Sequence, residues 1–148
     1  GAGAAAGLES RPGEGRRVSD LEALLLEQIA AAGLPMPKTE FRFESLFSLT
    51  PKLKKPRRWR FDCCWDRLKL LVEVDGATWA NGRHNRGAGY ESDAEKTNEA
   101  GERGWLVLRF TGAMVKDGRA IAQIRRILEL RQRVRWGSLP VAGYSETE

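Results

Sequence analysis

The sequence predicts an α/β fold in which helices cover both faces of a small mixed sheet. The length of 148 residues suits one domain, and 41% hydrophobic with 30% charged residues is typical of a globular chain. Apolar residues recur at helical spacing near both ends, and alternating or continuous apolar runs lie between them. The predicted order of elements is helix, three strands, helix, strand, helix, with no internal repeat.

Three segments have the apolar spacing of helices. The first, VSDLEALLLEQIAAAG, contains Ser19, a residue type that caps helix N-termini, and ends at Gly33. Its regularly spaced apolar residues are Leu21, Leu24, Leu25, Ile29 and Ala32. The second helix is expected over 92–104 and the third over 118–134. The apolar residues of the third are Ile121, Ile124, Ile127, Leu128 and Val134.

Four segments are expected to be strands. LPMPKTEFRFE passes from a proline-bounded turn into the first, and in RRWRFDCCW the residues Trp59, Phe61 and Cys63 alternate with charged ones. LKLLVEVD follows after a short turn, which is consistent with a hairpin. Its even-numbered apolar residues should share one face, and Glu73 and Asp75 the other. WLVLRF is a continuous apolar run, typical of a strand covered on both faces.

The chain is interpreted as one domain over residues 18–136. Residues 1–17 are rich in Gly and Ala without periodicity and are expected to be a disordered lead, and residues 137–148 a flexible tail. Residues 76–91 are rich in Gly and Asn and show neither the helical nor the strand periodicity of apolar residues, so we expect a long mobile loop there. Loops of this length usually have a function.

Composition points to a polyanionic partner. The 25 Lys and Arg exceed the 20 Asp and Glu, for a net charge of +5, which favours nucleic acid as the first candidate. No apolar run is long enough to span a bilayer, and no signal-peptide pattern is present. Cys63 and Cys64 are neighbours, so we expect two reduced thiols in a reducing compartment such as the cytoplasm. A single histidine and no CxxC pair argue against a structural zinc site.

Three carboxylates on two neighbouring strands predict a divalent-metal site. Glu73 and Asp75 should share one face of their strand, and Asp62 lies across the presumed hairpin turn, where it can approach Glu73. Carboxylates that converge repel one another unless a cation lies between them, and hard oxygen ligands select Mg²⁺ or Mn²⁺. The alternative is that these carboxylates pair with arginines at the strand end.

The order of these motifs resembles that of the PD-(D/E)XK nuclease superfamily. The resemblance is carried by FD, then VEVDG, then a helix and GWLVLRF, and extends from about Ser19 to about Leu130. Within the superfamily it is closest to small phage-type proteins related to very-short-patch-repair endonucleases and Holliday junction resolvases. It implies a three-layer α/β/α sandwich of the restriction-endonuclease-like type.

The resemblance also implies a catalytic role for the carboxylates. Asp62 and Glu73 would bind Mg²⁺, with Mn²⁺ as a substitute, and the Val74 carbonyl would be a further ligand. A water aligned by the metal would then attack a DNA phosphodiester. The sequence departs from the family where a lysine usually stands two positions after the glutamate, because that residue is Asp75. Either Lys96 on the following helix replaces the lysine, or Asp75 binds a second metal ion; as a further alternative, Lys96 is a solvated helix residue.

Two more residues are candidates for catalysis. Resolvase-like members carry an acidic residue in the first helix, and Glu22 fits that position better than Glu27 does, although Ser19 and Glu22 also have the spacing of a capping box. His84 lies in the 76–91 loop. In very-short-patch-repair-like relatives, loop histidines take part in proton transfer, so His84 could protonate the leaving oxygen; the alternative is a solvated side chain.

Basic residues near these motifs predict contacts to DNA. Arg83 and Arg86 flank His84, and guanidinium groups match phosphate bidentately. A basic run before the second strand should follow the DNA backbone. Its members include Lys54, Lys55, Arg57 and Arg58. The arginines of the last helix are interpreted as a solvated face.

Together these features predict a Mg²⁺-dependent endodeoxyribonuclease. By resemblance it would be selective for branched or mismatched DNA, as a Holliday junction resolvase or a repair nickase is. A junction resolvase would be a symmetric homodimer, because it has to cut two strands. The missing strand lysine supports a different hypothesis, a catalytically inactive DNA-binding module on the same fold. A metal-dependent enzyme acting on RNA is a third hypothesis.

Overall fold

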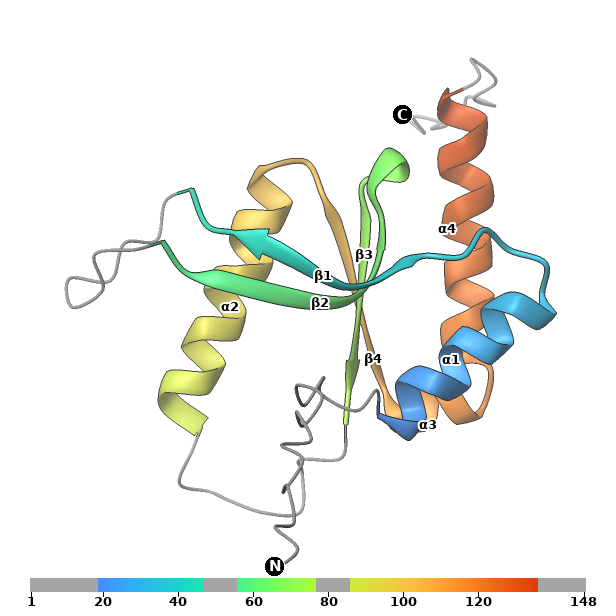
Figure 1. The fold of residues 1–148 in the computed structure, drawn as a ribbon, viewed down its shortest axis with the longest axis horizontal. Coiled ribbons are helices and arrows are strands. Elements are labelled where there is room, and N and C mark those ends of the chain that lie inside the picture. Colours follow the sequence, from blue (N-terminus) through green and yellow to red (C-terminus); the bar gives the residue numbers. More distant parts are fainter. Residues whose placement is uncertain (1–18, 47–55, 77–85, 136–148) are drawn as a thin grey trace, which may run out of the picture.

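The computed structural model describes residues 19–46, 56–76 and 86–135 (Figure 1). In chain order the elements are α1 (Asp20–Ala31), β1 (Lys38–Glu44), β2 (Arg58–Trp65), the 3₁₀ turn η1 (Asp66–Leu68), β3 (Leu70–Asp75), α2 (Arg86–Glu102), β4 (Leu106–Thr111), α3 (Gly112–Lys116) and α4 (Arg119–Arg135). The predicted order is found, with η1 and α3 in addition. The expected lead 1–17 and tail 137–148 lie outside the described residues. None of the helices described is long and apolar enough to cross a membrane.

The strands form one mixed sheet in the order β1-β2-β3-β4, which confirms the predicted fold class. β2 is antiparallel to both β1 and β3, whereas β3 and β4 are parallel. The predicted hairpin joins β2 to β3 through η1, after which Lys69 adopts a left-handed conformation with φ 53°. Two parallel strands need a crossover connection, and α2 provides it between β3 and β4.

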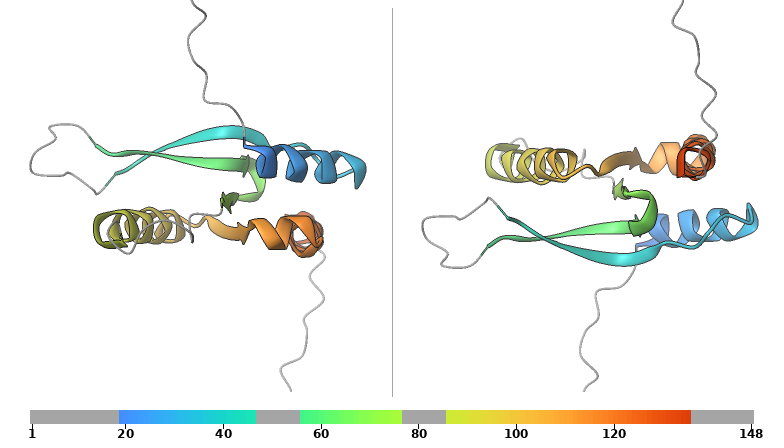
Figure 2. Two further views of the ribbon diagram at one scale, coloured as in Figure 1. Left: turned by 90° about the horizontal axis from the view of Figure 1, so that it is seen from below. Right: turned by 90° about the horizontal axis from the view of Figure 1, so that it is seen from above.

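Helices cover both faces of the sheet, so the chain has three layers. One face packs against α1, α3 and α4, and these helices contribute Leu25, Ile29, Val115, Ala120, Ile124 and Leu128 to its core. The other face packs against α2, where Ala100 meets the aromatic residues Phe43, Trp59 and Phe61. The left view of Figure 2 shows α2 beneath the β1–β2 pair, with α1 and α4 at the opposite end of the molecule. Burying each large apolar side chain contributes about 1.5–3 kcal/mol, so both layers are held by their cores.

Two helices differ from the sequence prediction. α2 begins at Arg86, so the part of the expected 76–91 loop that the structure describes after residue 85 is helical. Gly87 and Gly89 are poor helix formers and break the local pattern, which is why the prediction started the helix at Ser92. The five-residue helix α3 was not predicted because it is too short to show a period. It begins after Thr111, whose Oγ1 accepts the Met114 N–H at 3.4 Å.

The alternation of faces along β2 is interrupted at Asp62. Phe61 belongs to the core under α2, whereas Cys63 belongs to the core under α1 and α4. In regular β structure two such residues would share a face, as the sequence analysis expected. Glu40, which lies between the β1 partners of Phe61 and Cys63, has a left-handed conformation with φ 50°. This irregularity places Asp62 at a break in the strand pattern.

Candidate active site

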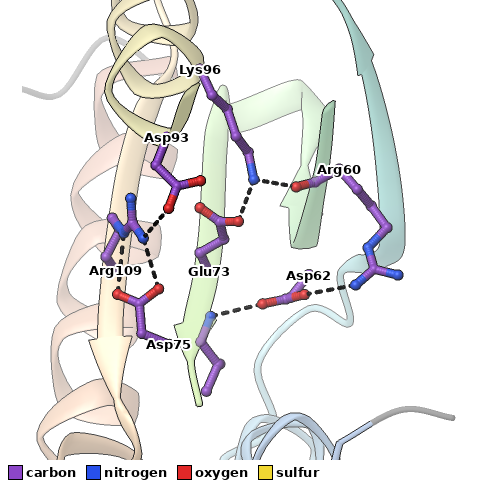
Figure 3. A network of polar contacts seen from close by, with 8 residues as sticks. Arg60, Asp62, Glu73, Asp75, Asp93, Lys96 and Arg109 are labelled. Atoms are coloured by element: carbon purple, nitrogen blue, oxygen red, sulfur yellow. Dashed lines mark hydrogen bonds and ion pairs between the residues drawn. The ribbon is translucent and has the colours of Figure 1, made fainter. Parts of the chain in front are cut away.

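Lys96 of α2 reaches the carboxylate of Glu73 on β3 (Figure 3). Its Nζ donates to Glu73 Oε1 and to the backbone carbonyl oxygen of Arg60, and it lies 4.2 Å from the centre of the Phe61 ring. Lys96 is 6% exposed, so its charge is compensated by Glu73 more than by water. The helix thus brings an ammonium group to a strand that has none of its own.

Glu73 has one bound and one unbound carboxylate oxygen. Oε1 accepts from Lys96, whereas Oε2 is buried and has no hydrogen-bond partner among the described residues. Burial raises the pKa of Glu73, an effect that the Lys96 ammonium opposes and the nearby Asp62 carboxylate increases. Buried acceptors are normally satisfied by protein, water or an ion. Oε2 can therefore accept a further ligand.

Asp62 is fixed on β2 beside the end of β3. Its Oδ2 accepts a hydrogen bond of 2.8 Å from the Val74 backbone N–H, and its Oδ1 lies 3.8 Å from the Arg60 guanidinium. The register of β2 with β3 ends with Cys63 opposite Val72, and the bond to the Val74 N–H brings the Asp62 carboxylate to the segment of β3 that carries Glu73. The two carboxylates therefore come from neighbouring strands, and the charge of Asp62 contributes to the raised pKa of Glu73.

Asp75 has an arginine partner (Figure 3). Arg109 of β4 donates to both oxygens of Asp75, at 2.8 and 3.2 Å, and lies 3.6 Å from Asp93 of α2. Within the described ranges, no three His, Cys, Asp or Glu residues form a group that could hold a metal ion. The structure thus differs from the expected convergence of three carboxylates, because Arg109 compensates the charge of Asp75 where a shared cation was expected.

Glu22 lies in the first turn of α1. Ser19 caps this helix, and its Oγ accepts the Glu22 backbone N–H at 3.2 Å, as in one half of a capping box. Burial raises the pKa of the Cys63 thiol to about 12, and the charges of Asp62 and Glu22 both add to this shift. The charge of Glu22 therefore acts on the residue next to Asp62.

The predicted DNA-contacting residues are only partly described. His84, Arg83, Lys54 and Lys55 lie outside the described residues, and Arg86 is the first residue of α2.

Arg57 and Arg58 lie next to each other where β2 begins. Arg57 donates to Ser92 Oγ at 3.0 Å and lies 3.3 Å from Glu95, so it connects the start of β2 with α2. Arg58 is exposed.

Arg60, Asp93 and Arg109 are not among the site residues that the sequence predicts. The carbonyl of Arg60 orients Lys96, and Arg109 joins Asp75 to Asp93. Arg109 is the one charged residue in WLVLRF, so an unexplained charge inside an apolar run was a usable signal. The role of Arg60 rests on its backbone, for which the sequence gives no signal.

The donor groups fit a hard divalent cation. Asp62 and Glu73 offer carboxylate oxygens from adjacent strands, including the unpartnered Oε2. Mg²⁺ prefers oxygen ligands and is commonly held by one or two carboxylates together with several waters.

No family model and no curated protein sequence matches this chain. Among solved structures, the catalytic domain of the homing endonuclease I-Bth0305I is similar, with a TM-score of 0.49 and 17% sequence identity. The match covers 77% of this chain and 98% of that domain. A likeness of this degree concerns the path of the backbone alone.

Proposed function

We propose that the chain is a divalent-metal-dependent DNA endonuclease that hydrolyses phosphodiester bonds. The observation that carries the proposal is the position of Lys96, whose Nζ contacts Glu73 beside Asp62 on the adjacent strand. Two carboxylates with an ammonium group are suited to holding a cation and stabilising a reacting phosphate. The net charge of +5 suits a polyanionic substrate.

Each side chain has its own part in this proposal. Asp62 and Glu73 would hold Mg²⁺, which when bound supplies an activated water and offsets the negative charge of the phosphoryl group. The Val74 N–H fixes the orientation of the Asp62 carboxylate. Lys96 keeps the proton off Glu73, because burial alone would favour the neutral acid, a poor metal ligand.

The proposed substrate is branched or mismatched DNA. This finer specificity is supported by the sequence resemblance to junction resolvases and very-short-patch-repair endonucleases. A resolvase activity would further require a symmetric homodimer.

Cleavage of a four-way junction, a mismatched duplex and a plain duplex, with Mg²⁺ or Mn²⁺, tests the proposal. Asp62→Asn and Glu73→Gln should each lower the rate by about a hundredfold or more, the usual effect of removing one group that stabilises transition-state charge. Both variants should still bind DNA. Glu27→Gln, an exposed change on α1, is the matched control and should cleave like the wild type. Wild-type rates in both site variants would end the proposal.

A catalytically inactive DNA-binding module is the second candidate. It is favoured by the full engagement of Lys96 with Glu73 and Arg60 and by Asp75 at the usual place of the lysine. This candidate predicts binding without product on every substrate in the panel, with either metal.

A further inference from the structure

The C-terminal part of the described chain is strongly basic. Residues 112–135 contain seven Lys or Arg and two Asp or Glu, a net charge of +5. The other basic segment of the sequence is the run 52–60, with six Lys or Arg and no Asp or Glu. Since residues 112–135 form α3 and α4, these helices can carry a basic surface separate from that run.

The outer side of α4 carries a row of arginines. The buried residues of this helix are Ala120, Ile124 and Leu128. At 3.6 residues per turn, Arg119, Arg126 and Arg133 fall on the opposite side, each about 10.5 Å further along the helix axis. All three are exposed, as is Arg125 next to them.

The arginines of α4 differ in their contacts. Arg131 donates to the Leu68 and Lys69 carbonyls at 2.7 and 3.0 Å and so supports the β2–β3 turn. Arg119 pairs with Asp117 at 2.7 Å.

Three further arginines have no such structural role. Arg125, Arg126 and Arg133 form no ion pair within the described part of the chain, although Glu129 lies one helical turn from each of them. Arg125 and Arg126 are also too far from the helix C-terminus to gain from its dipole. Neither packing nor helix electrostatics accounts for Arg125 and Arg126, whereas Arg133 lies in the last turn of α4, where the dipole favours a cation.

We propose that the outer surface of α4, formed by Arg119, Arg125, Arg126 and Arg133, binds the phosphate backbone of duplex nucleic acid. Guanidinium groups pair bidentately with phosphate, and a row of them matches a regular polyanion. The surface belongs to the layer opposite α2, which carries Lys96 (Figure 1). It therefore contributes affinity and takes no part in hydrolysis. The inference rests on the proposed function only for the choice of nucleic acid as the polyanion.

An anionic membrane is disfavoured as the partner. A helix that lies on a membrane inserts a broad apolar face, and the apolar face of α4 is already buried against the sheet. The large hydrophobic residues that α4 exposes among those described are Leu130 and Val134, at 46% and 48%. Two side chains provide too little apolar area for insertion, whereas phosphate contacts need none.

Binding of a labelled plain duplex, measured by fluorescence anisotropy over a salt series in EDTA, tests the proposal. Arg126→Gln/Arg133→Gln should weaken binding about tenfold and reduce the slope of log K against log salt by about 2, one for each lost phosphate contact. Arg42→Gln/Arg67→Gln removes two exposed charges elsewhere and should leave the slope nearly unchanged. The charge-conserving Arg126→Lys/Arg133→Lys should keep the wild-type slope and rule out a folding defect.

Three results would overturn the proposal. The first is unchanged duplex binding by Arg126→Gln/Arg133→Gln, and the second is an equal loss in the Arg42→Gln/Arg67→Gln control. The third is loss of binding to phosphatidylserine vesicles with duplex binding intact, which would identify a membrane surface. EDTA prevents metal-dependent cleavage, so the binding assay is independent of the endonuclease proposal. A protein that cleaves no DNA but whose duplex binding depends on the α4 arginines contradicts only the proposed endonuclease activity. A protein that cleaves DNA but whose duplex binding does not depend on these arginines contradicts only the proposed binding surface.

Discussion

The guanidinium of Arg109 donates to both carboxylate oxygens of Asp75, at 2.8 and 3.2 Å, and lies 3.6 Å from Asp93. One side chain of β4 is thereby linked to the end of β3 and to α2. Lys96 follows Asp93 by three residues, about one helical turn, so the contact with Asp93 fixes α2 close to the point where Lys96 meets Glu73. Arg109 is in this way a positioning residue for the ammonium group.

Replacing Arg109 should therefore affect cleavage more than stability. Arg109→Gln is expected to lower the junction-cleavage rate about tenfold, as misplacement of a catalytic group does. The ion pair is partly exposed, so the free energy of unfolding in urea should fall by only about 1 kcal/mol. Lys38→Gln, which removes another exposed ion pair, that of Lys38 with Asp66, is the control and should change neither quantity appreciably. A wild-type rate in Arg109→Gln would show that α2 is held without this contact.

Local patterns in the sequence predict the order of helices and strands and the placement of Asp62 and Glu73 on neighbouring strands. The Ser19 cap and the apolar spacing behind it define α1, and the short connection between β2 and β3 brings Asp62 next to Glu73. Both inferences need only neighbouring residues. The start of α2 was missed because Gly87 and Gly89 weaken a helix whose first turns carry little apolar pattern.

The partners of charged residues could not be predicted in the same way. Strand periodicity places Glu73 and Asp75 on one face, but it does not say that Arg109, 34 residues later, will bind Asp75. Likewise, the approach of Lys96 to Glu73 depends on how α2 crosses the sheet, which is a tertiary relationship. Sequence spacing therefore identified the candidate groups, and the three-dimensional arrangement selected their partners.

Lys96 should control the pH dependence of stability through Glu73. Burial gives Glu73 a higher pKa in the folded than in the unfolded chain, so the folded chain binds its proton more tightly. The resulting stabilisation is present below the unfolded pKa and is lost as pH rises through the folded pKa. Lys96→Met removes the charge that opposes this shift, so the loss should be larger and extend to higher pH.

Urea unfolding in EDTA across a pH series measures this effect. At neutral pH, Lys96→Met should cost roughly 1–3 kcal/mol, because it leaves a buried carboxylate without its partner. Adding Glu73→Gln to Lys96→Met should abolish the pH-dependent loss. Lys116→Met, on the exposed side of α3, serves as the control. The assigned role of Lys96 would be contradicted by identical pH profiles for Lys96→Met and the wild type.

Mg²⁺ should stabilise the folded chain through Asp62 and Glu73. A ligand at a hundred times its Kd adds about 2.7 kcal/mol to folding stability, which is a readily measured rise in Tm. Asp62→Asn and Glu73→Gln should each abolish the rise, and Glu27→Gln should retain it. Asp75→Asn distinguishes a site that binds one metal ion from a site that binds two. If Asp75 only pairs with Arg109, the rise in Tm with Mg²⁺ should persist in this variant. A full rise in Glu73→Gln would place the cation elsewhere.

The two cysteines should report on the integrity of β2 next to Asp62. Burial raises the pKa of Cys63 to about 12 and that of Cys64 to about 11. At pH 8 both thiols are then almost entirely protonated, whereas the thiolate is the form that reacts with disulfide reagents. Ellman's reagent should therefore modify neither thiol in the folded chain and both in urea, with the Cys63→Ser and Cys64→Ser variants assigning each signal.

Because Cys63 adjoins a proposed metal ligand, Mg²⁺ should slow any residual modification of Cys63 in the folded wild type but not in Glu73→Gln. Rapid modification of Cys63 in the folded chain would mean that β2 opens at the site more readily than its burial implies.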